Sequence, residues 1–207
     1  MTERMVCALS QGRRSLLEPV VIAVGGVMAS GKSTVAEALG DRLSAPVIDA
    51  DRTRKRLIGI DPTTHASSPA FEGPYSPATT ERVYAELMHR GSVVLESGRP
   101  VVLDASFRTE DMRRAARDLA AEHGVPFLMV ECRARAEVCR ARLLRRERET
   151  SVSDGRLELF DAFCARVEPV REIADAERIV CDTERPLADT LAALGDRLRA
   201  WPKGLNG

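Results

Sequence analysis

The stretch from Gly26 to Ser33, Gly-Val-Met-Ala-Ser-Gly-Lys-Ser, has the residue types and the spacing that bind phosphate groups. It matches the P-loop pattern G-x-x-x-x-G-K-[ST]. Glycines let the backbone approach a phosphate, and successive N–H groups at the start of a helix hold the anion. Lys32 is expected to reach the β- and γ-phosphates, and Ser33 to place its hydroxyl on Mg²⁺. The motif therefore predicts ATP and Mg²⁺ as cofactors, with nucleotide contacts from Gly26, Ala29, Ser30, Gly31, Lys32, Ser33 and Thr34.

Lysine is rare in this chain, and one of its lysines lies in this motif. Of the 31 basic residues only three are lysine, at positions 32, 55 and 203, and the others are arginine. A compact ammonium acts on a phosphate as a point charge, whereas arginine presents a planar fork. Lysine at position 32 therefore strengthens the prediction of a phosphate-binding loop.

Three acidic residues follow two apolar runs that we predict to be strands. Asp49 and Asp51 follow the run 45–48, with Arg54 three residues after Asp51, and Asp104 follows Val-Val-Leu. Ligands of α/β sheets bind at the carboxyl ends of the strands. A buried carboxylate is costly without a partner, so Asp104 is expected to contact Mg²⁺ or the acceptor of the phosphate. The alternative is that Asp51 caps a helix and Asp104 caps a turn.

The densest run of positive charge lies between positions 140 and 148. We interpret it as a lid that closes over the phosphates, because such a lid brings arginines to the charge of the transition state. Arg142 and Arg146 are the members that we expect to act. The alternative is a solvated helix face on which the arginines alternate with Glu147 and Glu149.

Predicted strands and helices alternate along the chain. Apolar β-branched runs predict strands at 19–25, 45–48, 99–103, 125–130 and 178–180. Helices are predicted at 32–43, from Pro77 to about 90 or beyond, after Thr109, and at 134–149, 155–167 and 186–200. This alternation indicates an α/β fold with a mostly parallel five-stranded sheet and helices on both faces. Residues 1–18 are expected to be a flexible arm.

Composition excludes several classes of protein. The net charge is zero, which makes a nucleic-acid partner unlikely without excluding it. No apolar run is long enough to span a membrane, and no signal peptide is recognisable. The five cysteines form no CxxC pair or Cys/His cluster, so we expect reduced thiols and a cytoplasmic location.

The classes of P-loop protein differ in their further motifs. Guanine-specific GTPases read the base with Asn-Lys-x-Asp, but the one asparagine of this chain is Asn206. Mechanical ATPases usually follow the strand-end aspartate with a glutamate that activates water, whereas Ala105 follows Asp104 here. This difference favours transfer of the phosphate to a bound acceptor over hydrolysis.

The sequence resembles the zeta-toxin/polynucleotide-kinase-like P-loop kinases over most of residues 20–195. The resemblance is carried by the P-loop and by Ile48-Asp-Ala-Asp-Arg-Thr-Arg-Lys55, Tyr75-Ser-Pro, Arg82-Val-Tyr84, Val102-Leu-Asp-Ala-Ser-Phe107, Ser153-Asp154 and Asp182-Thr183. It is more similar still to the ATP-binding (AAA-type) domain often fused to an aminoglycoside phosphotransferase-like domain. The resemblance implies a three-layer P-loop kinase fold at 19–207, with a helical lid at about 140–155.

The same resemblance implies roles for individual residues. Asp51 would accept the proton of the acceptor hydroxyl, Arg54 would hold the acceptor or a phosphate, and Asp182 and Thr183 would touch adenine. Asp49 remains an alternative base or a ligand of a Mg²⁺-bound water. Tyr75, Arg82 and Tyr84 flank the long loop at 59–78 and are expected to line the acceptor pocket, with packing of the tyrosines in the core as the alternative.

The expected activity is Mg²⁺-ATP-dependent transfer of the γ-phosphate to a hydroxyl of a small molecule. Three alternatives stay open at this point. The acceptor could be the 5′-hydroxyl of a polynucleotide or a nucleotide sugar, as for zeta toxins. The chain could also be an ATP-binding module without enzymatic activity.

Overall fold

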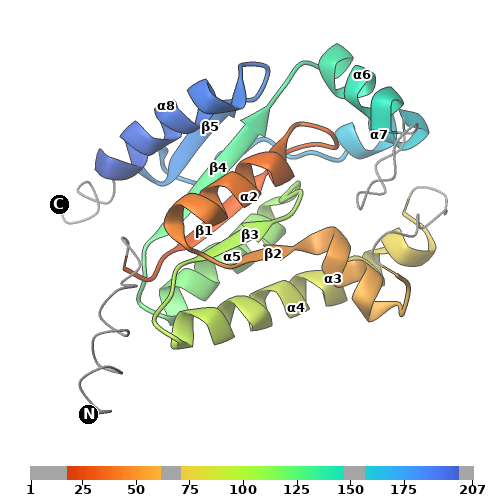
Figure 1. Cartoon of the computed structure of the whole chain (residues 1–207). Coiled ribbons are helices and arrows are strands. Elements are labelled where there is room, and N and C mark those ends of the chain that lie inside the picture. Colours follow the sequence, from red (N-terminus) through yellow and green to blue (C-terminus); the bar gives the residue numbers. More distant parts are fainter. Residues whose placement is uncertain (1–17, 62–70, 147–156, 201–207) are drawn as a thin grey trace, which may run out of the picture.

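The computed structural model describes residues 18–61, 71–146 and 157–200 (Figure 1). The predicted arm at 1–18 lies outside these residues except for its last position, and the predicted lid at about 140–155 is described only as far as Arg146. None of the helices in the described ranges is long and apolar enough to pass through a membrane.

A sheet of five parallel strands forms the centre of the molecule. Its order is β2-β3-β1-β4-β5, and every neighbouring pair is parallel. The predicted five-stranded sheet is thus confirmed, and it is fully parallel where the sequence indicated a mostly parallel sheet. Four strands extend past the carboxyl ends of the predicted apolar runs: β2 to Asp49, β3 to Asp104, β4 to Arg133 and β5 to Asp182. The strands are β1 (Val21–Gly25), β2 (Val47–Asp49), β3 (Val101–Asp104), β4 (Phe127–Arg133) and β5 (Arg178–Asp182).

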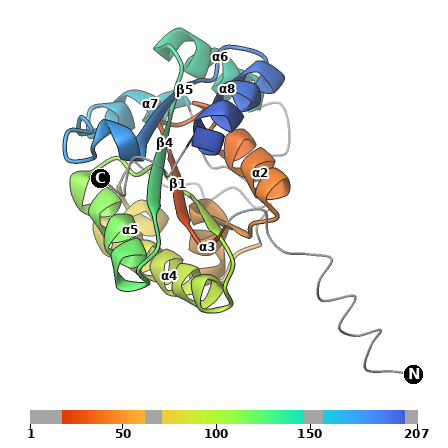
Figure 2. The ribbon, with the colours of Figure 1, turned by 90° about the vertical axis from the view of Figure 1, so that its left-hand side faces the viewer.

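Successive residues of β1 pack into opposite faces of the sheet, as the pleat of a strand requires. Val21 and Ala23 belong to one buried apolar cluster, and Ile22 and Val24 to the other. Each face is covered by two long helices, which lie on opposite sides of the strands in Figure 2. The first face carries α4 (Pro77–Glu96) and α5 (Glu110–Glu122), and the second carries α2 (Lys32–Leu43) and α8 (Leu187–Ala200). The three-layer α/β fold is confirmed.

Side-chain caps begin three of the helices. The side-chain oxygens of Asp49, Ser76 and Thr109 each accept a backbone N–H three residues further on. The predicted starts after Ser76 and Thr109 are confirmed. Asp49, rather than Asp51, caps α3 (Ala50–Leu57), so Asp51 lies inside the first turn. Short 3₁₀ turns are present at Gly73–Tyr75 and Asp175–Glu177.

Two further helices, α6 (Ala136–Arg146) and α7 (Leu157–Cys164), pack over the P-loop. Cys139 and Leu143 of α6, Phe160 of α7 and Ala29 of the loop form a third buried cluster. α7 ends at Cys164, before the predicted end at 167, and the predicted continuation of α6 to 149 lies outside the described residues. This small cluster places the cationic face of α6 beside the P-loop.

Candidate active site

The P-loop follows β1 directly, and its backbone has conformations that favour glycine. Gly26 has φ 153°, and a Cβ there would lie 2.6 Å from the carbonyl oxygen of Cys132. Its N–H donates to the carbonyl of Ser106 at 3.2 Å. Gly31 has φ 88° and begins α2. Any side chain at Gly26 would therefore force the loop away from β4.

The amino end of α2 is open. Gly31 occupies the N-cap position, and none of the described side chains caps the helix. The first N–H groups of a helix need partners, and together they form an anion-binding site. Lys32, Ser33 and Thr34 form the first turn, with Lys32 and Ser33 half-buried and Thr34 exposed. The geometry is that of a phosphate cradle, as the motif predicts.

Two side chains from distant segments hold the far side of this loop. The hydroxyl of Thr183 donates to the carbonyl of Ser30 at 2.5 Å. Arg142 donates to the carbonyl of Ala29 at 3.1 Å and to that of Thr183 at 2.6 Å. Arg142 therefore supports the loop through backbone carbonyls, and its predicted contact with the transferring phosphate stays a prediction. The adenine contacts of Thr183 and of the exposed Asp182 stay predictions.

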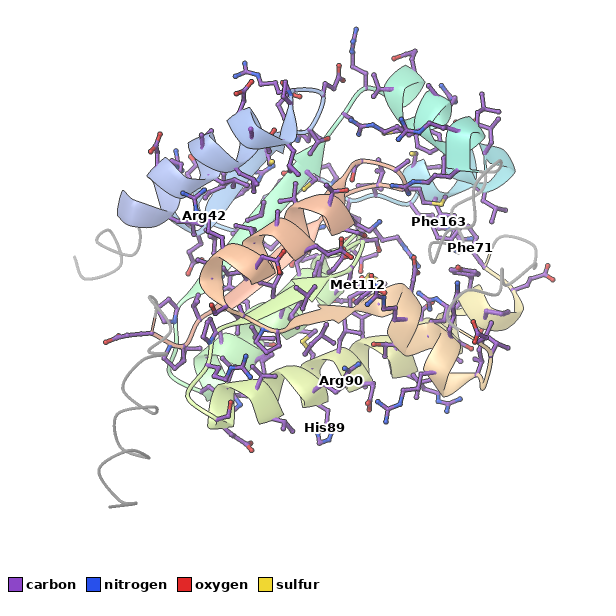
Figure 3. The ribbon with its side chains drawn as sticks, in the orientation of Figure 1. Arg42, Phe71, His89, Arg90, Met112 and Phe163 are labelled. Atoms are coloured by element: carbon purple, nitrogen blue, oxygen red, sulfur yellow. The ribbon has the colours of Figure 1, made fainter. Side chains whose placement is uncertain are left out.

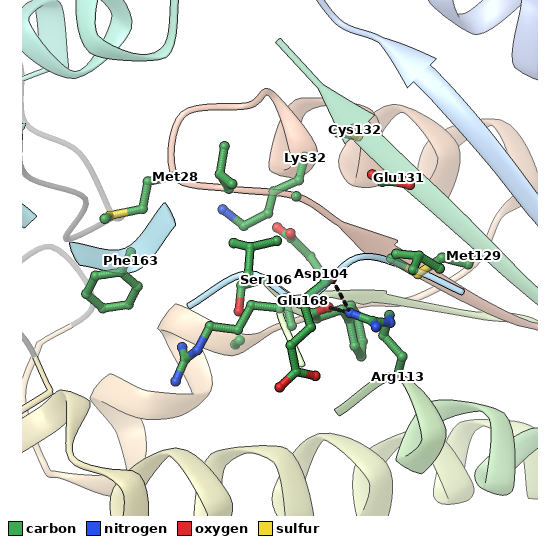
Figure 4. A pocket seen from close by; sticks show the side chains of 18 of the residues that line it. Met28, Lys32, Asp104, Ser106, Arg113, Met129, Glu131, Cys132, Phe163 and Glu168 are labelled. Atoms are coloured by element: carbon green, nitrogen blue, oxygen red, sulfur yellow. Dashed lines mark hydrogen bonds between the residues drawn. The ribbon is translucent and has the colours of Figure 1, made fainter. Parts of the chain in front are cut away.

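Asp104 lies at the end of β3 with its side chain facing the P-loop. Only 2% of the residue is exposed, and burial raises the pKa of its carboxyl group to about 7, against the lowering effect of the Lys32 ammonium. Ser33 donates a hydrogen bond to this carboxylate, and the neighbouring Asp49 raises its pKa further. Figure 4 shows Lys32 and Asp104 extending into the same space.

These groups fit a magnesium ion. Oδ1 of Asp104 is buried and has no hydrogen-bond partner among the described residues, although a buried carboxylate oxygen needs one. Carboxylate and hydroxyl oxygens are the ligands that Mg²⁺ takes from P-loop proteins. The described residues hold no group of three or more His, Cys, Asp or Glu that could bind a metal, so phosphate and water would complete the shell. Ser33 and Asp104 would hold the ion.

Asp51 and Arg54 lie one turn apart on α3. Asp51 is half-buried, whereas 6% of Arg54 is exposed and its guanidinium lies 4.7 Å from the ring centroid of Tyr75. Burial lowers the pKa of Arg146, Arg142 lowers it further, and the attraction of Asp51 raises it. Arg146, at the end of α6, is therefore within electrostatic reach of Asp51.

One cavity of about 510 Å³ connects the P-loop lysine, the strand-end Asp104 and the Asp51–Arg54 pair. Its lining includes Lys32, Asp51 and Asp104, together with Tyr75 and Tyr84. Both tyrosines are also buried. They therefore line the cavity and pack in the core at the same time, and the two interpretations of the sequence are compatible. A cavity of this size suits a small organic molecule. We call it the phosphate cavity.

A family model for an AAA domain matches residues 21–170, which is well over half of the chain. The chain belongs to this AAA-domain family. Uncharacterized proteins of Mycobacterium tuberculosis and Mycobacterium bovis are 33% identical to this chain over 143 residues. The match covers 69% of this chain and 28% of each relative, so the chain spans little more than a quarter of their length.

Solved structures of kinases share the fold of this AAA domain. A gluconokinase from Sinorhizobium meliloti 1021 has a TM-score of 0.59 at 23% identity, covering 90% of this chain and 98% of that chain. A sugar kinase from Janibacter sp. HTCC2649 has a TM-score of 0.66 at 19% identity and the same coverage. The APS kinase CysC of M. tuberculosis, in complex with AMPPNP and APS, has a TM-score of 0.61 at 21% identity, covering 88% and 98%. The P-loop kinase fold is confirmed, whereas the narrower resemblance to zeta toxins, polynucleotide kinases or a phosphotransferase fusion stays a prediction.

Sequence reasoning missed several residues that line the phosphate cavity of the AAA domain. Arg108 comes from the segment after β3, Phe163 from α7, and Glu168 from the segment that follows α7. Arg108 lies four positions after Asp104, at the ligand-binding edge of the sheet, and that position was a usable signal. Phe163 and Glu168 had no local signal, because only the packing of α7 brings them to the site.

Proposed function

We propose that this AAA domain is a Mg²⁺-ATP-dependent kinase that transfers the γ-phosphate to a hydroxyl of a small molecule. One observation carries the proposal: a single cavity joins the P-loop lysine, the strand-end Asp104 and the Asp51–Arg54 pair. A kinase needs its nucleotide phosphates and its acceptor side by side, since catalysis of phosphoryl transfer is mainly positioning and electrostatic stabilisation.

Each group of the site has a task in this reaction. Lys32 and the open amino end of α2 hold the β- and γ-phosphates, and Arg146 adds positive charge. Asp51 orients the acceptor hydroxyl and takes its proton. The hydroxyl oxygen bonds to the γ-phosphorus as the bond to the β–γ bridging oxygen breaks, and ADP leaves. Because a carboxylate is a weak base toward an alcohol, Asp51 accepts the proton late in the transfer.

Magnesium, held by Ser33 and Asp104, would neutralise phosphate charge in this site. The protein itself supplies the enclosure. Buried tyrosines and apolar residues line the cavity, and they limit the access of water to the transferring group. Ala105 lies directly after Asp104, so that position has no carboxylate to activate water for hydrolysis.

A measurement of ADP release with a panel of acceptors tests the proposal. The panel contains sugars, sugar acids, nucleosides, aminoglycosides, a nucleotide sugar and a 5′-hydroxyl oligonucleotide, and GTP replaces ATP in a parallel series. We expect ATP-dependent release with a small hydroxyl compound, above the level of Lys32→Ala protein prepared in the same way. Release with the oligonucleotide alone would favour a polynucleotide kinase. Binding of ATP without turnover of any acceptor would contradict the proposal and indicate a binding module.

The cellular setting is also part of the proposal. Cys132, Cys139, Cys164 and Cys181 are free thiols, which supports the expectation of a reducing cytoplasm. The much greater length of the mycobacterial relatives leaves room for further domains that could supply or consume the phosphorylated product. Activity should therefore be assayed with the chain alone and with any such domain added.

A further inference from the structure

Three arginines and three aromatic rings meet at the end of the phosphate cavity that faces away from β4. We call this group the arginine–aromatic cluster; it consists of Arg54, Arg108, Arg166, Phe71, Tyr75 and Phe163. Phe71 and Phe163 stack with ring centroids 4.7 Å apart and lie side by side in Figure 3. Tyr75 meets the Phe163 ring edge to face at 6.0 Å.

The arginines approach these rings from different elements. The guanidinium of Arg166, just after α7, lies 3.4 Å from the Phe71 centroid, and that of Arg108 lies 5.5 Å from the Phe163 centroid. Cation–π contacts of this kind fix a guanidinium without neutralising its charge. The positive charge of the cluster therefore stays available to a ligand.

The three arginines are close enough to repel one another. Burial lowers the pKa of Arg108; the nearby Tyr84 opposes this, and the positive charges of Arg54 and Arg166 lower the pKa further. Among the described residues, no carboxylate forms a salt bridge with any of the three, whereas Arg113 pairs with Glu172 and Arg178 pairs with Glu131. Arg54 is buried, Arg108 is half-buried and Arg166 is exposed, so the repulsion acts mainly on the first two, and a bound anion would offset it.

Arg54 is the member of the cluster with a buried, unpaired donor. It is 6% exposed, its Nη1 reaches the carbonyl of Pro74 at 3.5 Å, and its Nε is buried without a hydrogen-bond partner in the structure. Leaving a charged donor buried and unpaired is more costly than leaving a neutral one. Glu168 also lines both hollows, but its Oε2 accepts the N–H of Glu110 at 2.6 Å and it forms no hydrogen bond or salt bridge with Arg54 in the described residues.

The cluster also lies at the right place for an acceptor. Arg54 and Arg108 line the phosphate cavity, and a neighbouring hollow of about 820 Å³ is lined by Arg108 and Arg166. Asp51 and Arg54 are three residues apart on α3, on the same side of the helix, which separates them by about 4.5 Å along its axis. A small molecule can thus contact both the proposed base and the cluster.

We propose that the acceptor is a small alcohol that carries an anionic group, and that Arg54, Arg108 and Arg166 bind that group. The anion is a phosphate, sulfate or carboxylate, and the carbon skeleton lies against Tyr75 and Phe163. This inference rests on the proposed kinase function and names the substrate class for it. Arg108 and Arg166 thereby select the acceptor, while Asp51 and Lys32 act on the transferring phosphate.

Pairs of acceptors with and without an anionic group on the same carbon skeleton test the inference. Glucose is compared with glucose 6-phosphate and glucose 6-sulfate, open-chain glucitol with gluconate, and adenosine with its 3′- and 5′-monophosphates. We expect turnover to prefer an anionic member, and the preferred member identifies the anion. A hydrogen bond to a charged group contributes about 1.5–3 kcal/mol, so Arg108→Gln should raise the KM for that acceptor about 10- to 100-fold while the KM for ATP stays unchanged.

Arg166→Gln and Arg56→Gln complete the comparison. Arg166→Gln should act like Arg108→Gln, because it removes another donor of the cluster. Arg56 lies on α3 but is exposed and outside both hollows, so Arg56→Gln should leave every constant unchanged. Preference for the neutral member of each pair would overturn the inference, and so would an unchanged KM in both cluster variants.

A binding experiment separates this inference from the proposed function. Mg²⁺ and AMPPNP fill the P-loop first, so that added anions cannot bind there, and each anionic alcohol is then titrated by calorimetry. Binding to the wild-type protein that is lost in Arg108→Gln protein supports the anion site, whether or not turnover occurs. Such binding without turnover would contradict the kinase proposal and leave the anion site supported. The absence of binding by every anionic alcohol at millimolar concentration would overturn the inference.

Discussion

Asp49 and Asp104 occupy paired positions on the neighbouring parallel strands β2 and β3. The carboxylate of Asp49 accepts the N–H of Arg52 at 2.6 Å and caps α3, whereas the buried carboxyl of Asp104 faces Lys32. Two acids at the same level of the sheet therefore have different tasks. Asp49 positions the helix that carries Asp51, and Asp104 faces the P-loop.

Lys32→Ala should abolish phosphoryl transfer and leave the fold intact. Lys32 is half-buried at the start of α2 and contributes charge to the site rather than apolar packing. Removing one preorganised positive group from a transition state typically lowers kcat by about 10²–10³-fold or more. The measurement is ADP release, with circular dichroism to verify the fold. Turnover at the wild-type rate in a folded variant would show that the P-loop is not the catalytic site.

Asp51→Asn should damage chemistry far more than nucleotide binding. Loss of a group that accepts the acceptor proton typically lowers the rate by about 10²–10⁴-fold. Asp49→Asn is the comparison that tests the alternative base, because asparagine is also a good N-cap and keeps α3 in place. Calorimetry with Mg²⁺-ATP and single-turnover rates should separate the two variants. If Asp49→Asn loses activity while Asp51→Asn keeps it, the base is Asp49 and not Asp51.

Arg142→Ala should weaken nucleotide binding rather than slow the chemical step. The side chain donates to the backbone carbonyls of Ala29 and Thr183, and its loss frees the outer side of the P-loop. Hydrogen bonds to a charged donor contribute about 1.5–3 kcal/mol, so the Kd for ATP should rise about 10- to 100-fold. Arg145, exposed on the same helix, supplies the control Arg145→Ala. A large fall in kcat at unchanged Kd would instead support a direct role in catalysis.

Glu172→Gln should destabilise the protein at neutral pH. Glu172 pairs with Arg113, which is 1% exposed and also donates to the carbonyl of Phe107 at 3.1 Å. Breaking a buried pair leaves a buried charge without its partner and costs about 3 kcal/mol. Denaturant unfolding measures the change. Glu37→Gln is the control, since Glu37 forms a surface pair with Arg52 at 3.9 Å that should contribute little.

The pair of Arg113 and Glu172 also predicts that the free energy of unfolding depends on pH. The hydrogen bond from Arg113 lowers the pKa of Glu172 from 4.5 to about 2. The folded state therefore binds fewer protons than the unfolded state in this range, and the stabilisation is complete above pH 4.5 and is lost as the pH falls towards 2. The difference in unfolding free energy between wild type and Glu172→Gln should shrink over that window. A difference that stays constant down to pH 2 would contradict the assignment.

The sequence by itself determined the phosphate site and the layered sheet. Gly26 to Ser33 is a local pattern, because the turn and the helix start that bind phosphate lie within one short segment. Asp51 and Asp104 could be placed as well, since the carboxyl ends of parallel strands share one edge. The alternating strands and helices likewise predicted the five-stranded α/β fold.

Only the tertiary structure decided how the rest of the site is assembled. Thr183 and Arg142 hold the P-loop from segments more than a hundred residues away, and Arg54, Arg108 and Arg166 come from three separate elements. No sequence period links such residues, because their distances depend on strand order and helix packing. Local spacing could therefore predict the phosphate-binding loop, whereas long-range packing decided which charges lie together beside the cavity.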